Sequence, residues 1–290
     1  MLTRRDLLRV GLGLGVAHAA LTTIPAWAAP QGDVPARLRL ALLHMASVPG
    51  DFTANRAMLE RGLAIAAQHG ADVLLTPELA LSGYEFRAVL GLDWIPTMPD
   101  PWLRNFGRKA GRLGITPVIG TPDRDADGNL RNAMLVLGSD GNVVGSHWKI
   151  NVIPDVVEGS AVPGTDTIPV DVHGIPTGLL ICADSYNAKN AAQAARLGAR
   201  LLLSSAAWMP GEMGPQGIWE ARTRETGLPL VVCNRTSIDP SSDASRSRSV
   251  GVINGARTFS YHSAHSHVLL VDLIGEELAP RLVRALRLPG

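Results

Sequence analysis

Three residues of types that catalyse acyl transfer each follow an apolar run of the kind that forms a buried strand. Cys182 comes directly after such a run, Glu78 follows Pro77 at the end of another, and Lys149 closes a short run that begins after the turn signal Asp140-Gly141. Proline cannot donate to a sheet ladder, so a strand is expected to end near Pro77. Singly, these residues fit a buried apolar thiol, a loop carboxylate and a solvated cation. Together, they supply a nucleophile, a proton carrier and a positive charge at strand ends.

Apolar runs of strand length alternate with amphipathic segments of helix length along most of the chain, which predicts α/β layers. A turn at 139–142 is flanked by two strands, and the tail 249–272 favours strands and turns. The pattern alone leaves open whether the strands form one parallel sheet or two stacked sheets. The further strands are expected at 37–45, 72–76, 115–120, 167–172, 178–182, 200–204 and 228–233, and the helices at 52–69, 102–113, 189–197 and 218–226.

The segments around these three residues resemble the motifs of the nitrilase superfamily of carbon–nitrogen hydrolases, in the same order and spacing. The motifs are Pro77-Glu78-Leu79-Ala80-Leu81-Ser82-Gly83-Tyr84, His147-Trp148-Lys149-Ile150 and Leu180-Ile181-Cys182-Ala183-Asp184. Companion stretches lie at 132–134, 163–164, 203–208 and 233–235, and the resemblance runs from about Arg37 to about Asp272. It implies a four-layer α-β-β-α sandwich that commonly pairs through one helical face, so a homo-oligomer, a dimer, is expected.

The resemblance also implies roles in hydrolysis. Cys182 attacks as a thiolate, Lys149 stabilises the thiolate and the developing oxyanion, and Glu78 carries protons between thiol, leaving group and water. The backbone N–H of Ala183 is the expected second oxyanion donor. The family carries a second glutamate after the lysine, and Glu158 matches it best in a supporting role. No metal or organic cofactor is required by this chemistry.

Three aromatic residues follow family motifs and are the expected substrate-binding side chains, namely Tyr84, Tyr186 and Trp208; as large aromatics they would serve equally well in a core. The segment after the cysteine lacks the glutamate-asparagine run of true nitrilases, which favours amide or N-carbamoyl substrates over nitriles. It also lacks the family's nearby arginine, so a substrate carboxylate has no obvious partner there.

The overall composition is that of a globular protein with a large core, with 46% hydrophobic and 18% charged residues. A net charge of +1 offers no electrostatic basis for binding nucleic acid or an anionic membrane. No internal repeat or phosphate-binding glycine loop is found in the sequence. One domain, 29–290, is expected.

The first 28 residues resemble a twin-arginine export signal. Arg4-Arg5 precede an apolar stretch, and Ala26-Trp27-Ala28 fits a cleavage site. The stretch is short for a membrane span. We therefore expect a removable signal peptide at 1–28, export by the twin-arginine machinery and a periplasmic or secreted protein; the alternative is an uncleaved anchor.

Export would expose the two cysteines, Cys182 and Cys233, to an oxidising compartment. A disulfide between them would remove the nucleophile, so catalysis requires both to be unbonded. Cys233 is expected to be a small buried apolar residue.

Two other groups of residues are of types that occur in binding sites. His262, His265 and His267 have no carboxylate or cysteine cluster beside them in the sequence, so we predict no metal site. Arg246 and Arg248 lie in a serine-rich segment that favours a loop over an anion site, although such a loop beside the pocket could act as a lid.

The sequence therefore predicts an exported, thiol-dependent hydrolase that cleaves a small linear amide or N-carbamoyl compound. A nitrilase or an acyltransferase of the same fold is an alternative, as is a small-molecule binding protein that has lost turnover. Missing membrane spans disfavour a lipoprotein acyltransferase, and the lack of a following ATP-using domain disfavours an NAD synthetase arrangement.

Overall fold

The computed structural model describes residues 36–154, 157–211, 215–239 and 242–289. The expected signal peptide lies outside the described residues, so that boundary stays a prediction.

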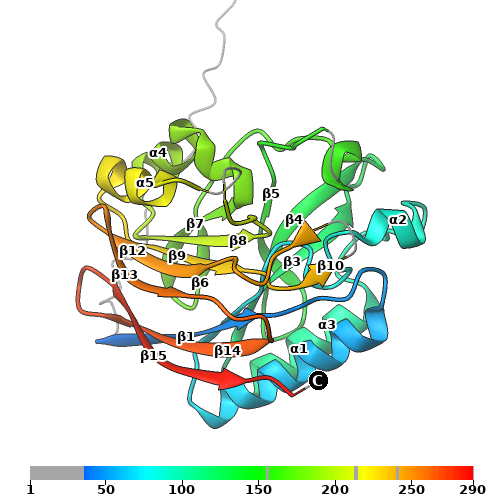
Figure 1. Cartoon of the computed structure of the whole chain (residues 1–290), viewed down its shortest axis with the longest axis horizontal. Coiled ribbons are helices and arrows are strands. Elements are labelled where there is room, and N and C mark those ends of the chain that lie inside the picture. Colours follow the sequence, from blue (N-terminus) through cyan, green and yellow to red (C-terminus); the bar gives the residue numbers. More distant parts are fainter. Residues whose placement is uncertain (1–35, 155–156, 212–214, 240–241, 290) are drawn as a thin grey trace, which may run out of the picture.

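Two mixed β-sheets dominate the described chain (Figure 1). The strands of the first sheet are, in spatial order, β15 (Ala279–Arg287), β14 (His267–Ile274), β1 (Arg37–His44), β2 (Val73–Leu75), β3 (Thr116–Arg124), β4 (Leu130–Leu137) and β5 (Val143–Trp148). Those of the second are β13 (Ala256–Tyr261), β12 (Ser249–Ile253), β9 (Leu230–Asn234), β8 (Leu201–Ala206), β7 (Ile175–Ile181) and β6 (Val170–Val172). A short hairpin pairs β10 (Ile238–Asp239) with β11 (Ser242–Asp243).

Helices cover the outer faces of the two sheets. The helices are α1 (Phe52–Gln68), α2 (Phe86–Leu90), α3 (Pro101–Arg112), α4 (Ala188–Arg196) and α5 (Ile218–Thr226), with 3-10 turns η1 (Val157–Ser160) and η2 (Cys182–Tyr186). Figure 1 shows α1 and α3 on the side of the first sheet, and α4 and α5 on the side of the second.

The side-chain alternation of β1 shows how this layering arises. Leu38, Leu40 and Leu42 belong to the core that lies between the sheets, whereas Ala41 and Leu43 belong to the core beneath α1 and α3. Successive residues of a strand point to opposite faces, so a strand that is buried on both faces needs an almost continuous apolar run. The predicted four-layer α-β-β-α sandwich is confirmed.

The expected elements agree with the structure to within a few residues, and α5 has the predicted bounds. Strands β1, β2 and β3 are parallel, whereas β3, β4 and β5 are antiparallel. The elements that were not predicted are the short helix α2, the hairpin of β10 and β11, the two 3-10 turns and the final strand β15. Among the described residues, none of the helices combines the length and the apolar character that a membrane span requires.

Candidate active site

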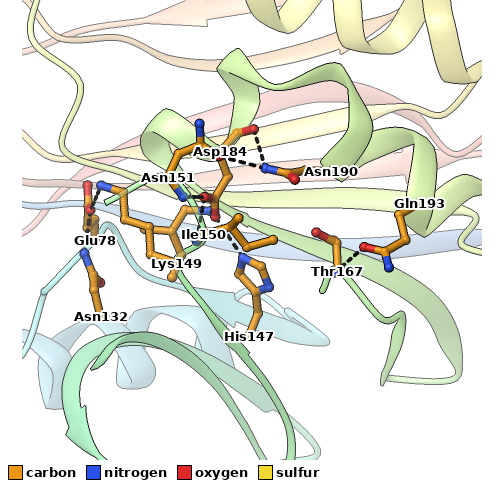
Figure 2. Close-up of polar contacts among 11 residues, drawn as sticks. Glu78, Asn132, His147, Lys149, Ile150, Asn151, Thr167, Asp184, Asn190 and Gln193 are labelled. Atoms are coloured by element: carbon orange, nitrogen blue, oxygen red, sulfur yellow. Dashed lines mark hydrogen bonds and ion pairs between the residues drawn. The ribbon is translucent and has the colours of Figure 1, made fainter. Parts of the chain in front are cut away.

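A fully buried ion pair joins Glu78 to Lys149. The Nζ atom of Lys149 donates to Oε1 of Glu78 at 2.7 Å, and neither side chain is exposed to solvent (Figure 2). Burying a single charge in a core is costly unless a partner compensates it. Each residue therefore stabilises the other in the interior, which explains how a lysine is accommodated among the largest buried side chains.

Two further donors fix the Glu78 carboxylate. Asn132 Nδ2 donates to Oε1 at 2.8 Å, and the backbone N–H of Ala207 donates to Oε2 at 3.0 Å. Both oxygens are thereby oriented before any substrate arrives. Asn132 had no predicted role beyond its place in the family-like stretch 132–134. The available signal was a polar residue directly before the apolar run 133–137 of β4.

The position of Glu78 depends on a close approach between two strands. Thr76 Oγ1 accepts a hydrogen bond of 2.8 Å from the backbone N–H of Gly120 in β3. A Cβ atom at Gly120 would lie 2.2 Å from the carbonyl oxygen of Pro77. Only glycine leaves room for the backbone that carries Glu78.

Cys182 lies at the abrupt end of β7, with its backbone in the left-handed region. Its φ is +45°, and it is the first residue of η2. A residue with a Cβ pays roughly 1–2 kcal/mol for this conformation. The side chain is buried, as is the following residue Ala183. Such sharp turns hold a nucleophile rigidly at the end of a strand.

Asp184 connects the turn that contains Cys182 to the segment that follows Lys149. Its Oδ1 atom accepts hydrogen bonds from the backbone N–H groups of Ile150, at 2.9 Å, and Asn151, at 2.8 Å (Figure 2). The two predicted catalytic segments are therefore bonded to each other. Asp184 lies within one of the family-like motifs, but no role was predicted for it.

The other carboxylate oxygen of Asp184 accepts a hydrogen bond of 2.9 Å from Ile181 N and contacts His147 Nε2 at 2.8 Å. Burial acts to raise the pKa of Asp184, but the His147 contact and the backbone donors outweigh it and hold this pKa below its usual value. The carboxylate therefore stays ionised in the interior.

The strand register places the predicted cysteine at the same end of the sheets as the glutamate. Strands β7 and β8 are parallel, with Ile181 opposite Ser205. Cys182 follows Ile181, and Ala207, two residues beyond Ser205, donates to Glu78. The thiol and the buried ion pair therefore lie at neighbouring strand ends.

The other predicted site residues are Glu158 and the three aromatic residues. The backbone of Glu158 lies in η1, and its side chain is outside the described part, so its role stays a prediction. Tyr186 is half-exposed and its ring centroid lies 4.8 Å from that of the buried Trp208. The Tyr84 ring lies under the guanidinium of the buried Arg235, 5.0 Å away.

The two cysteines are free and buried. Cys233 Sγ donates to the carbonyl oxygen of Leu43 at 3.3 Å, and burial raises the pKa of this thiol well above its usual value. Cys233 is therefore protonated and unreactive at neutral pH. In the described part of the chain, no group of three or more His, Cys, Asp or Glu side chains could hold a metal ion.

Comparisons with known proteins agree with this geometry. The family model for carbon-nitrogen hydrolases matches residues 39–266. An amidase from Nesterenkonia sp. superposes with a TM-score of 0.71 at 25% identity, covering 84% of this chain and 94% of that one.

Two curated relatives match over shorter stretches. A hydrolase from the pqqF 5′ region of Pseudomonas protegens is 29% identical over 171 residues, covering 57% of this chain and 58% of the relative. A glutamine-dependent NAD(+) synthetase from Thermotoga maritima is 31% identical over 155 residues, covering 52% of this chain and 26% of the relative. The match thus spans less than two thirds of either relative. The family match covers most of the chain, and the chain belongs to the carbon-nitrogen hydrolase family of the nitrilase superfamily.

Proposed function

We propose that this carbon–nitrogen hydrolase cleaves a small linear amide or N-carbamoyl compound through a thioester on Cys182 and releases ammonia or an amine. One observation carries the proposal: the buried Glu78–Lys149 pair is connected through Asp184 to the turn that begins with Cys182. This arrangement provides a fixed carboxylate, a fixed cation and a rigidly held thiol.

In the first half-reaction, the sulfur of Cys182 attacks the carbonyl carbon, and the thiol proton passes to Glu78. The ammonium group of Lys149 and the N–H of Ala183 stabilise the oxyanion of the tetrahedral intermediate. The C–N bond then breaks, and Glu78 gives its proton to the leaving nitrogen. The products are ammonia or an amine and a thioester, or the corresponding S-carbamoyl thiocarbamate in the N-carbamoyl case.

In the second half-reaction, water attacks the thioester carbon while Glu78 accepts one of its protons. The second intermediate collapses to a carboxylic acid, or a carbamic acid in the N-carbamoyl case, and the proton returns to the sulfur of Cys182. Glu158 supports Lys149 or the attacking water in this proposal. No cofactor takes part in either half.

Two observations favour amides over nitriles as substrates: the segment after Cys182 lacks the glutamate-asparagine run of true nitrilases, and one similar protein is an amidase. The Nesterenkonia amidase, 25% identical to this chain, has been solved in complex with butyramide. We propose that Tyr84, Tyr186 and Trp208 line the substrate site; the contact between the last two rings supports this for that pair.

We also propose export through the twin-arginine machinery, a periplasmic or secreted location and assembly as a dimer. The paired residues Arg4-Arg5 carry the export proposal. Replacing both with lysine should leave the protein in the cytoplasm on fractionation, and sedimentation of the mature protein measures its oligomeric state.

Intact-protein mass spectrometry after brief exposure to butyramide, N-carbamoyl compounds and nitriles tests the reaction. An acyl adduct that maps to Cys182 is expected, and its mass identifies the substrate class. An adduct that forms only with nitriles would favour a nitrilase. Transfer of the acyl group to an added amine in preference to water would favour an acyltransferase. If no adduct forms and Cys182 reacts with iodoacetamide as slowly as Cys233, the protein is a binding protein.

A further inference from the structure

A cavity of about 300 Å³ lies beside Trp208, between the end of β8, helix α5 and the start of β12. This volume is at the lower end of the range of small-molecule sites, roughly 300–1,000 Å³. The indole rings of Trp208 and Trp219 both line it and meet edge to face, with their centroids 5.4 Å apart. The two rings form a rigid apolar wall against which the flat apolar part of a ligand can pack.

Among the described residues that line this cavity, the charged side chains are three arginines: Arg246, Arg248 and Arg257. Arg257 is balanced by Glu220, 2.5 Å away. Arg248 donates to a neutral partner, the hydroxyl of Ser260, at 3.2 Å. Among the described residues of the lining, Arg246 and Arg248 thus present two guanidinium groups, and no carboxylate is among those described residues.

Two buried polar atoms of the lining are without a partner. Ser247 Oγ and Trp219 Nε1 each have no hydrogen-bond partner among the described residues, and each residue is only 1% exposed. Buried polar groups are normally paired, because an unpaired one loses its bonds to water without replacement. Both can donate, which is what an oxyanion requires.

The described lining of the cavity does not include Glu78, Lys149 or Cys182, but it shares Trp208 with the proposed substrate site. Asn234 fixes the backbone of Trp208 in both directions, accepting from its N–H and donating to its carbonyl oxygen, each at 2.9 Å. Trp208 also follows Ala207, which donates to Glu78, and packs on Tyr186. A ligand in the cavity would therefore lie against the residue next to the Glu78 contact.

We propose that this cavity binds a small organic carboxylate with a flat apolar body. Arg246 and Arg248 hold the carboxylate, since a guanidinium matches a carboxylate with two parallel donors. The Ser247 hydroxyl and the Trp219 N–H supply the neutral donors, and the indole rings contact the apolar body. The site goes beyond the proposed function, and binding to it requires no turnover.

Calorimetric titration of the mature protein with benzoate tests this site, with benzyl alcohol as the uncharged counterpart and inorganic phosphate as the bare anion. Benzoate should bind one per chain, at least tenfold more tightly than either. Arg248→Gln and Arg246→Gln should each weaken benzoate at least fivefold, and Trp219→Phe should weaken it while keeping a ring. Arg112→Gln, an exposed arginine of α3, should change nothing.

Equal affinity for benzoate and benzyl alcohol, or no binding at all, would overturn the proposal. So would unchanged affinity in Arg248→Gln together with protection of Cys182 from iodoacetamide, because the anion would then lie at Lys149. The ligand is the substrate's own acid group if both arginine variants raise KM for a carboxylate-bearing amide but not for butyramide. It is a separate compound if benzoate binds through the arginines and neither KM changes.

Discussion

The imidazole of His147, at the end of β5, reaches across to the Asp184 carboxylate in the turn after β7, with 2.8 Å between Nε2 and Oδ2. The contact joins the two sheets at the point where each delivers a predicted catalytic residue, because Lys149 is two residues from His147 and Cys182 two residues from Asp184. Figure 2 shows the Asp184 side chain between these segments.

Replacing Asp184 with asparagine should disturb catalysis without touching the reacting atoms. An amide presents an N–H₂ group to donors that need an acceptor, so the variant should lose about 2–4 kcal/mol of unfolding free energy in urea. The turnover rate and the rate of Cys182 alkylation by iodoacetamide should both fall at least tenfold. Asp166→Asn, on the surface, is the control. Unchanged alkylation in Asp184→Asn would show that Asp184 does not position the thiol.

The two cysteines should respond in opposite ways to replacement by alanine. Cys182→Ala should abolish hydrolysis of any substrate found, with the fold retained. Cys233→Ala should keep its turnover and lose about 1–2 kcal/mol of stability, as expected for a small buried truncation. Steady-state kinetics and urea titration of both variants measure this. Loss of turnover in Cys233→Ala alone would reverse the assignment.

Glu78→Gln keeps the size of the side chain and removes the proton carrier. The rate should fall by about 10²–10⁴-fold, the usual contribution of general acid–base catalysis. Lys149 would also lose its balancing charge, so stability should fall by about 3–5 kcal/mol. A covalent adduct on Cys182 can still accumulate, which mass spectrometry would detect. Glu60→Gln, at a partly exposed carboxylate of α1 that pairs with Lys109, controls for the loss of a paired carboxylate. Wild-type turnover in Glu78→Gln would exclude Glu78 as the base.

Backbone strain at Cys182 predicts a difference between two inactive variants. Glycine adopts a φ of +45° without penalty, whereas alanine does not. Cys182→Gly should therefore be more stable than Cys182→Ala by about 1 kcal/mol. Thermal unfolding of the pair measures this, and a less stable glycine variant would contradict the strain.

The pH dependence of stability should include a contribution from His44. This residue is buried in β1, with Nδ1 3.0 Å from Ser249 Oγ, and burial lowers its pKa to about 4. In the unfolded chain the pKa is about 6.5, so between these values the unfolded state binds a proton that the folded state does not. Stability should fall by about 3 kcal/mol as pH decreases from 6.5 to 4 and should gain nothing above 6.5.

Urea titrations of wild type and His44→Gln at pH 7 and pH 4.5 isolate this contribution. The difference in free energy of unfolding between wild type and His44→Gln should be smaller at pH 4.5 than at pH 7. A gap that is independent of pH would show that His44 does not titrate in this way.

The layers and most strands could be predicted because apolar runs and turn residues are local signals. The choice of two stacked sheets came from the family resemblance, since the partner of a strand is not encoded in its own sequence. Strand β15 was not predicted because its arginines at 281, 284 and 287 and its proline at 280 interrupt the alternation of apolar and polar residues that is typical of a strand.

The predicted thiol, carboxylate and lysine could be found because each follows a strand. The residues that fix them could not. Asn132 and His147 act on groups that lie 54 and 37 positions away in the chain, and only the folded register brings them together. The arginine-lined cavity could not be predicted for the same reason. Arg246 and Arg248 have the sequence pattern of a polar loop, and only the fold brings them to the same cavity as the indole rings of Trp208 and Trp219.

The place of β1 in its sheet has a consequence for biosynthesis. β1 is among the first elements to leave the ribosome, yet it is bonded on one side to β14 along its whole length, from Arg37 opposite Ile274 to His44 opposite His267. Until that late segment emerges, β1 is an apolar edge, which invites pairing with other chains. Closing the sheet that carries Glu78 and Lys149 therefore requires the segment that begins at His267, and a chain that stalls before this residue should be a target for chaperones or proteases.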